Sequence, residues 1–188
     1  MKVVGLDTGT MTGWAAGSSD ERPRFGCWVL SVGYPGDIQG PVSSLWTSLG
    51  NLVDREKPDL ICFEQPMLGR AQMNKKTGNW GLNTSIGTLR RLYGLAATVE
   101  LFCAVNDIPV VETPLKSVKK SWAGNGNANK EAMKKAARER GFDIGDGPDA
   151  EHIADALGVW FHEVQFRDPR PDRLIRKPGG LFDDTPTS

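Results

Sequence analysis

Short apolar runs separated by turn residues open the chain and predict three strands. These runs cover residues 2–6, 12–16 and 24–32 and are rich in β-forming side chains. The gaps at 8–10 and 17–20 contain Gly, Ser, Thr and Asp, which are typical of turns. Because the connections are this short, the three strands are expected to form an antiparallel meander.

Longer periodic segments follow and predict helices that alternate with further strands. Val42, Leu45, Leu49 and Leu52 recur at helical spacing, and this helix is expected to end before Lys57-Pro58. The pattern then predicts a buried strand at 59–63, an exposed polar loop at 69–83, a helix over 85–106, a strand at 108–111, and helices around 130–140 and 150–164.

This order of elements predicts an α/β fold with a mixed five-stranded sheet. The meander supplies antiparallel strands, the later crossovers supply parallel ones, and helices cover both faces. Residues 1–166 are expected to form one domain. Residues 167–188 are rich in Pro, Arg, Asp and Gly without periodicity, so we expect a mobile tail there.

Composition says more about the cellular compartment of the protein than about its function. Among 188 residues, 23 Lys and Arg balance 23 Asp and Glu, so net charge identifies no partner. The three cysteines form no Cys-x-x-Cys pair, which favours reduced core thiols over disulfides or a zinc site. No secretory signal pattern and no apolar run near the ~18 residues of a membrane span is present, so we expect a cytoplasmic protein without membrane contact.

Two carboxylates directly follow buried strands. Asp7 comes after residues 2–6 and Glu64 after residues 59–63. If those two strands pair in parallel, both side chains lie at the same edge of the sheet. Each acid could also simply cap a turn, which is common at strand ends.

A third candidate element lies on the last predicted helix. His152 and Asp155 are three residues apart on a helix with an apolar stripe, so they share one face. Alone, such a pair fits a solvated rim. Together with Asp7 and Glu64 it gives three carboxylates and an imidazole, which suits Mg²⁺, and two such ions roughly 3.5–4 Å apart can drive an in-line displacement. A tetrahedral zinc fits less well because no cysteine is placed to join the histidine.

Basic residues gather in two stretches that flank these acids. Residues 65–99 and 113–130 contain no Asp or Glu. The side chains there that we expect to contact nucleic acid are Arg70, Lys75, Lys76, Lys116, Lys119, Lys120 and Lys130. The alternative is that these side chains only keep loops in solution. Trp80 and Trp122 lie in the same stretches, where a tryptophan stacks on a base or packs in the core.

Four motifs in a fixed order resemble one known family. GLDTGT ends the first strand, CFEQP ends the fourth, and HIADAL lies on the last helix. PLKSVKKSWAGNGNANKEAM adds a Val-Lys pair, a Gly-x-Gly turn and a lysine before a helix. Over roughly residues 1 to 165 the chain resembles the RuvC-type Holliday junction resolvases of the RNase H-like nuclease superfamily.

The resemblance implies an RNase H-like fold and an endonuclease that resolves four-way junctions or related branched DNA with two Mg²⁺ ions, Mn²⁺ being a substitute. Asp7 would bind both ions, and Glu64 and Asp155 would be the second and third carboxylate ligands. His152 would bind metal or help activate water. Lys119 and Lys130 match lysines that contact phosphates near the cut.

Symmetric nicking of a junction needs two sites, so a homodimer is also expected. The small residues Gly94, Ala96 and Ala97 suggest the helix over 85–106 as the contact, unless they only pack against the sheet.

Two departures from the family leave the natural substrate open. The segment between Glu64 and the next helix is longer than in typical members, and Met67 or Leu68 stands where many members have an aromatic residue. A YqgF-like RNA-processing nuclease and a non-catalytic protein that binds branched DNA are the alternatives. The VVGLDTGT stretch also resembles the phosphate-binding start of sugar kinases and actin-type ATPases, but these need a second lobe that the chain does not repeat.

Overall fold

A five-stranded mixed sheet forms the centre of the computed structural model, which describes residues 1–34, 36–67, 71–73, 80–82 and 84–168. Its strands, in the spatial order β3-β2-β1-β4-β7, are β3 Arg24–Val29, β2 Met11–Gly17, β1 Val3–Asp7, β4 Leu60–Glu64 and β7 Val110–Thr113. The first three pair antiparallel, and β1–β4 and β4–β7 pair parallel. The predicted fold class is confirmed.

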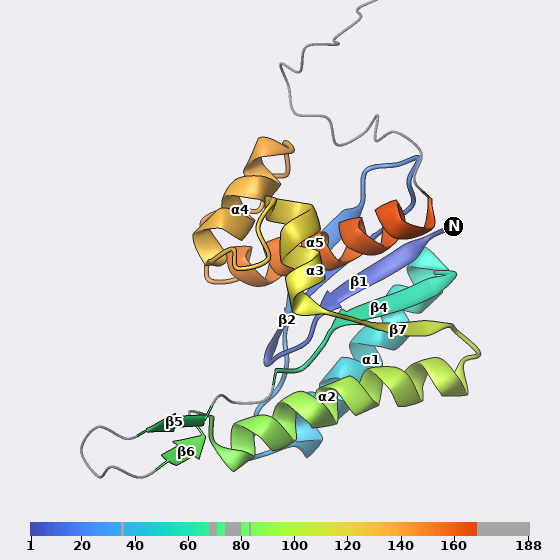
Figure 1. Ribbon diagram of the computed structural model, residues 1–188. Helices are drawn as coiled ribbons and strands as arrows, with labels where there is room; N and C mark the ends of the chain where they lie inside the picture. Colours follow the sequence, from blue (N-terminus) through green and yellow to red (C-terminus); the bar gives the residue numbers. More distant parts are fainter. Residues whose placement is uncertain (35, 68–70, 74–79, 83, 169–188) are drawn as a thin grey trace, which may run out of the picture.

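Helices cover both faces of this sheet (Figure 1). They are α1 Gln39–Glu56, α2 Ile86–Val105, α3 Leu115–Ala123, α4 Lys130–Glu139 and α5 Ala150–Arg167. Helices α1 and α2 pack on one face, and α3, α4 and α5 lie on the other. In the described part of the chain, none of the helices is both long and apolar enough to span a bilayer.

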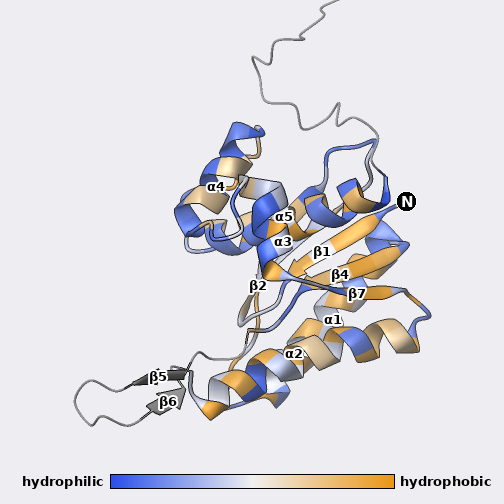
Figure 2. Ribbon diagram, viewed as in Figure 1, coloured by the Kyte–Doolittle hydropathy of each residue, from blue (hydrophilic) through white to orange (hydrophobic). Residues whose placement is uncertain are grey.

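The central strands owe their position to continuous apolar sequence. Val3, Val4 and Leu6 of β1 are fully buried, as is Ile61 of β4, because helices cover the sheet on both sides. Figure 2 shows both strands as hydrophobic along their length. Two cores result: Leu45 and other side chains of α1 and α2 fill one, while α3, α4 and α5 fill the other.

Helix ends follow local sequence signals. The Ser85 side chain accepts a hydrogen bond from the Thr88 amide at the start of α2. Helix α1 ends at Lys57, which adopts a left-handed conformation with φ 48° before Pro58. The predicted ends of these two helices are therefore correct to within about one residue.

Three details of the sequence-based prediction are wrong. The third strand ends at Val29 instead of residue 32. The predicted loop over 69–83 contains a hairpin of two three-residue strands, β5 Ala71–Met73 and β6 Trp80–Leu82, which are too short to show a period. Helix α3 was not predicted, because only Val118 and Trp122 of its nine residues are buried. The predicted tail lies outside the described residues beyond 168.

Candidate metal centre

The two strand-end carboxylates lie side by side at one edge of the sheet. Asp7 is the last residue of β1 and Glu64 the last residue of β4. Because the strands pair in parallel with Leu6 opposite Phe63, the next residue on each strand reaches the same edge. The predicted parallel pairing is confirmed, and it places two acids from distant parts of the sequence next to each other.

Two glycines let α5 lie directly on the sheet. A Cβ at Gly13, the residue opposite Asp7 in β2, would lie 1.9 Å from the carbonyl oxygen of His152. A Cβ at Gly5 would lie 2.4 Å from the backbone nitrogen of Trp160. Any side chain at these positions would push the helix away. Sequence reasoning missed both residues, although a glycine inside a strand is a known signal of close backbone approach.

This close packing brings the first turns of α5 to the strand ends. His152 Nδ1 lies 2.7 Å from an Asp7 carboxylate oxygen, and the two side chains are 27% and 19% exposed. The hydrogen bond to Asp7 raises the pKa of His152, although burial acts in the opposite direction. The imidazole is therefore held in place by one of the candidate ligands.

The other two carboxyl groups feel strong electrostatic crowding. Burial, followed by the charges of Asp7 and Asp155, raises the pKa of Glu64 from 4.5 to about 8. Burial and the charge of Asp7 raise the pKa of Asp155 from 3.8 to about 7. The ammonium of Lys119 partly offsets both shifts. Such a set of oxygen ligands, each destabilised as an anion, fits a hard divalent cation.

The four side chains converge without already forming a closed ligand cage. Within the residues that the structure describes, no group of three His, Cys, Asp or Glu side chains is positioned to hold a metal ion. Asp7 is engaged with His152. The carboxylate and imidazole groups are of the kind that binds a divalent cation. To bind one, their side chains would have to move closer together at the edge of the sheet.

Two of the predicted basic residues lie close to this edge. Lys119 acts on the charges of Glu64 and Asp155 from α3. Lys130 begins α4 and pairs with Glu151 of α5, and this hydrogen bond raises the lysine pKa. Glu151 was not among the residues predicted from the sequence. It lies outside the basic stretches, and nothing in them indicates an acidic partner for Lys130.

The remaining predicted DNA contacts have different outcomes. Lys116 and Lys120 are exposed on α3, whereas Arg70, Lys75 and Lys76 lie outside the described residues. Trp122 is 1% exposed and donates to the Met133 carbonyl, so it packs in the core and does not stack on a base. The side chain of Trp80 also lies outside the described part.

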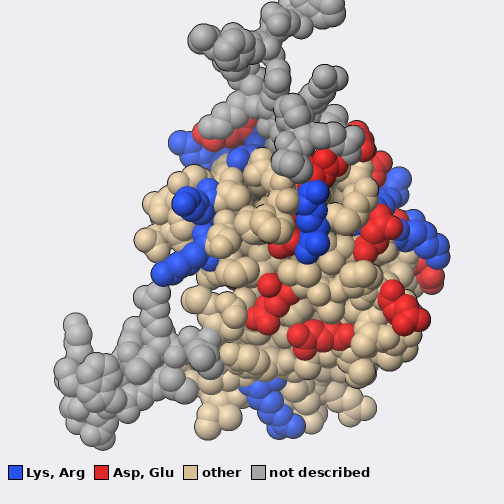
Figure 3. All heavy atoms as spheres, turned by 45° about the vertical axis from the view of Figure 1, so that its right-hand side comes forward, with Lys and Arg blue, Asp and Glu red and all other residues tan. Residues whose placement is uncertain are grey.

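The basic residues do not surround the molecule evenly. On the face shown in Figure 3, Asp and Glu side chains lie between Lys and Arg, so the described residues seen there form no continuous positive surface. Lys116, Lys119 and Lys120 all belong to α3. The positive charge near the carboxylates therefore comes from this helix and from the start of α4.

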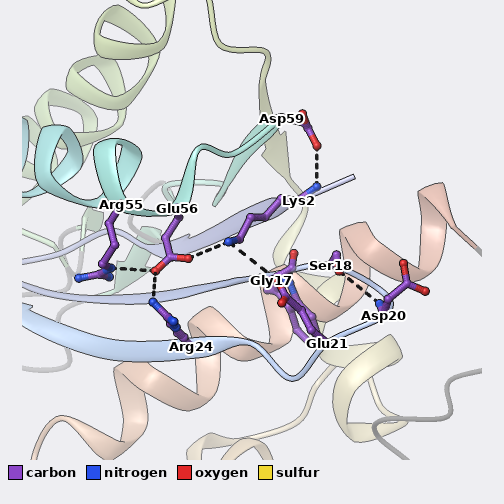
Figure 4. A network of polar contacts seen from close by, with 10 residues as sticks. Lys2, Gly17, Ser18, Asp20, Glu21, Arg24, Arg55, Glu56 and Asp59 are labelled. Carbon is purple, nitrogen blue, oxygen red and sulfur yellow. Dashed lines mark hydrogen bonds and ion pairs between the residues drawn. The ribbon is translucent and has the colours of Figure 1, made fainter.

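A buried acid at the opposite end of β1, surrounded by basic side chains, provides a contrast. Glu56 is 4% exposed and lies 2.8 Å from Arg55, 2.9 Å from Lys2 and 3.5 Å from Arg24 (Figure 4). Burial alone would raise its pKa, but the hydrogen bonds from Arg55 and Lys2 hold that pKa below the usual value. Glu56 is thus a satisfied structural acid, unlike the crowded Glu64 and Asp155.

Comparison with known proteins agrees with this geometry. No protein-family model matches the chain. The crossover junction endodeoxyribonuclease RuvC of Gloeobacter violaceus is 27% identical over 171 residues, which cover 87% of this chain and 90% of that protein. The protein of the same name from Dehalococcoides mccartyi is 26% identical over 163 residues, which cover 85% and 88%.

Solved structures show the same architecture. Thermus thermophilus RuvC in complex with a Holliday junction substrate gives a TM-score of 0.67 at 20% identity, covering 89% of this chain and 94% of that one. The yeast mitochondrial Holliday junction resolvase Ydc2 gives 0.58 at 14% identity, covering 88% and 78%. The chain therefore has an RNase H-like fold. Its sequence is similar to those of RuvC-type Holliday junction resolvases over most of its length.

Proposed function

We propose that the protein is a metal-dependent, structure-selective endonuclease that resolves Holliday junctions or related branched DNA. The observation that carries this proposal is the meeting of Asp7, Glu64, His152 and Asp155 at one edge of the sheet. Its RuvC relatives are named for cleavage of crossover junctions, which supports the same substrate class for this chain.

Each residue of the site has a proposed task. Asp7, Glu64 and Asp155 would hold two Mg²⁺ ions, or Mn²⁺ as a substitute. When bound, such ions lower the pKa of water and stabilise charge on the departing oxygen. His152, fixed by Asp7, would either join these ligands or accept a proton from the attacking water.

Hydrolysis adds water across one phosphodiester bond. A water oxygen bonds to phosphorus in line with the 3′ oxygen, the bond from phosphorus to that 3′ oxygen breaks, and the products are a 5′-phosphate and a 3′-hydroxyl. Lys119 would offset negative charge on the phosphate from its place beside Glu64. Lys130 could do the same once it leaves Glu151.

We also propose a homodimer, because a junction is resolved by two symmetric cuts. Of the three small residues considered for the contact, Gly94 packs against Ile38 of the same chain and Ala96 is buried in the core, whereas Ala97 is exposed. The outer face of α2 also carries the exposed apolar side chains of Leu101 and Val105, 59% and 63% exposed. Because branched DNA is the proposed substrate, we infer a cytoplasmic location.

A cleavage assay tests the proposed activity. Labelled four-way junctions are incubated with the protein and Mg²⁺, Mn²⁺ or Ca²⁺, beside linear duplex, flap and precursor-RNA controls. We expect cuts in the junction with Mg²⁺ and Mn²⁺, and binding without cutting with Ca²⁺. Asp7→Asn should bind and not cut, whereas Asp54→Asn on the exposed face of α1 should cut normally. Cleavage of RNA alone would favour the YqgF-like alternative, and binding without cleavage under every condition the non-catalytic one.

A further inference from the structure

A buried glutamate near the end of α5 reaches the two parallel strands beside the carboxylate site. Glu163 is 4% exposed, and its Oε1 accepts a hydrogen bond of 2.9 Å from the hydroxyl of Thr113, the last residue of β7. Its Oε2 accepts a second hydrogen bond, 3.2 Å long, from Nε of Arg167. Burial, followed by the charge of Glu163, raises the pKa of the Cys62 thiol on β4 well above its usual value. Glu163 therefore lies close to both β4 and β7.

Thr113 lies directly beside Glu64. The two residues are partners in the parallel pairing of β4 with β7, so their side chains lie on the same face of the sheet. Thr113 is fully buried, and its carbonyl accepts a hydrogen bond of 3.0 Å from the amide of Gln65. This bond continues the pairing one residue beyond Glu64. The end of β4 that carries Glu64 is therefore held in place by Thr113.

Thr113 is also linked to the basic side of the site. The next residue, Pro114, is the N-cap of α3, and this helix carries Lys119. The ammonium of Lys119 acts on the charges of Glu64 and Asp155. A displacement of Thr113 would therefore move the Glu64 carboxylate and the Lys119 ammonium together relative to α5.

The hydrogen bond between Thr113 and Glu163 joins these segments to α5, the helix that carries Asp155. On its other side α5 is fixed to β2, because the Trp160 indole nitrogen donates to the Gly17 carbonyl at 3.0 Å. From Asp155 to Glu163 the helix rises about 12 Å without interruption. Since a helix moves as a rigid element, the contact at Glu163 also limits the movement of Asp155 relative to the strands.

We propose that Thr113 and Glu163 are positioning residues of the metal centre. Their hydrogen bond fixes the separation of α5 from the end of β4, so that Glu64 and Asp155 need only side-chain movement to share a metal ion. Both residues act through the backbone that they hold, not as metal ligands. The proposal rests on the proposed nuclease function, because that function requires the metal.

Binding of Mn²⁺ alone to the full chain, followed by electron paramagnetic resonance, tests the proposal. Thr113→Val removes the hydrogen-bond donor at nearly constant volume, and we expect it to weaken Mn²⁺ binding about tenfold, as other changes to groups that orient ligands do. Thr113→Ser keeps a hydroxyl and should retain most of the affinity. Glu163→Met removes the acceptor and should behave like Thr113→Val. Glu163→Gln keeps an oxygen that can accept and should therefore bind Mn²⁺ more tightly than Glu163→Met.

Glu56→Gln is the matched control for a general loss of stability. It also changes a buried acid that is paired with an arginine, but at the opposite end of β1. It should lower the Tm and keep the wild-type affinity for Mn²⁺. If Thr113→Val keeps that affinity too, or if Glu56→Gln loses as much of it, the hydrogen bond only stabilises the fold and the positioning proposal is wrong.

Hydrogen exchange of the Gln65 amide, measured by NMR without metal, separates this proposal from the nuclease proposal. We expect this amide to exchange about fivefold faster in Thr113→Val than in the wild type, because the end of β7 that holds it is less firmly fixed. Glu56→Gln should leave its exchange rate unchanged. An unchanged rate in Thr113→Val would overturn the positioning role. If the rate rises as expected but the wild type binds no Mn²⁺, the hydrogen bond still positions the end of β4 and the nuclease proposal fails.

Discussion

The substitution Glu64→Gln should stabilise the protein when no divalent cation is present. Glu64 is buried beside Asp7 and Asp155, which raises its pKa from 4.5 to about 8. The folded protein therefore holds this proton to a higher pH than the unfolded chain does. For this group, the free energy of unfolding is greatest below about pH 4.5 and falls as the pH rises to about 8.

The size of the effect follows from the shift. One pKa unit corresponds to about 1.36 kcal/mol, so ionising Glu64 costs the fold at most about 4–5 kcal/mol. A proton on Asp155 relieves part of the same repulsion, because its own pKa is raised to about 7. We therefore expect Glu64→Gln to raise the free energy of unfolding by about 2 kcal/mol at pH 8, and by much less at pH 5.

Urea unfolding in a chelator at pH 5 and pH 8 measures this difference. About 2 kcal/mol corresponds to a rise of about 4–8 °C in Tm for a chain of this size. Glu100→Gln on the exposed side of α2 serves as the control. Mg²⁺ should raise the Tm of the wild type at pH 8 and have a smaller effect on Glu64→Gln. Equal stability of variant and wild type at pH 8 would refute the electrostatic argument for the metal centre.

Three further predictions follow from other parts of the molecule. Glu56→Gln should lower the free energy of unfolding by about 2 kcal/mol at pH 7, because two short charge-assisted hydrogen bonds are lost. Since the Glu56 pKa is lowered in the fold, this difference should shrink in urea titrations as the pH falls below about 4.5, and a constant difference would contradict it. Gly13→Ala should destabilise the fold by about 3 kcal/mol in thermal unfolding, since its Cβ would meet the His152 carbonyl. Gly50→Ala, which has open space around it, should not destabilise the fold. An alanine that is tolerated at position 13 would contradict the close packing of α5 on the sheet. Junction affinity, measured by fluorescence anisotropy, should fall steeply with salt, and Lys119→Ala should reduce the slope of log affinity against log salt by about 1; a flat dependence would remove the case for phosphate contacts.

The sequence predicted the order of the elements because their patterns are strong. Continuous apolar runs marked β1 and β4, and helical spacing marked α1 and α2. It failed where a pattern was short. The three-residue strands β5 and β6 and the nine-residue α3 carry too few periodic positions to stand out from polar surroundings.

Part of the candidate site could also be predicted from the sequence, because strong apolar patterns mark the strands that carry it. Asp7 and Glu64 could be located because each is the first charge after a buried run, and parallel pairing makes such residues neighbours. How closely α5 packs against the sheet could not be predicted in this way. It depends on Gly5 and Gly13, whose missing side chains matter only once the helix lies against them.

The chain by itself therefore determined which residue types stand at the strand ends and on the last helix. Only the tertiary structure decided how their charges interact. Burial of Glu64 and Asp155 beside Asp7 changes their pKa values, whereas Glu56, also buried, is paired with its neighbour Arg55 on α1 and with Lys2 and Arg24 from distant parts of the chain. Electrostatic energy depends on distance and dielectric surroundings, and both are set by packing between segments that the sequence keeps far apart.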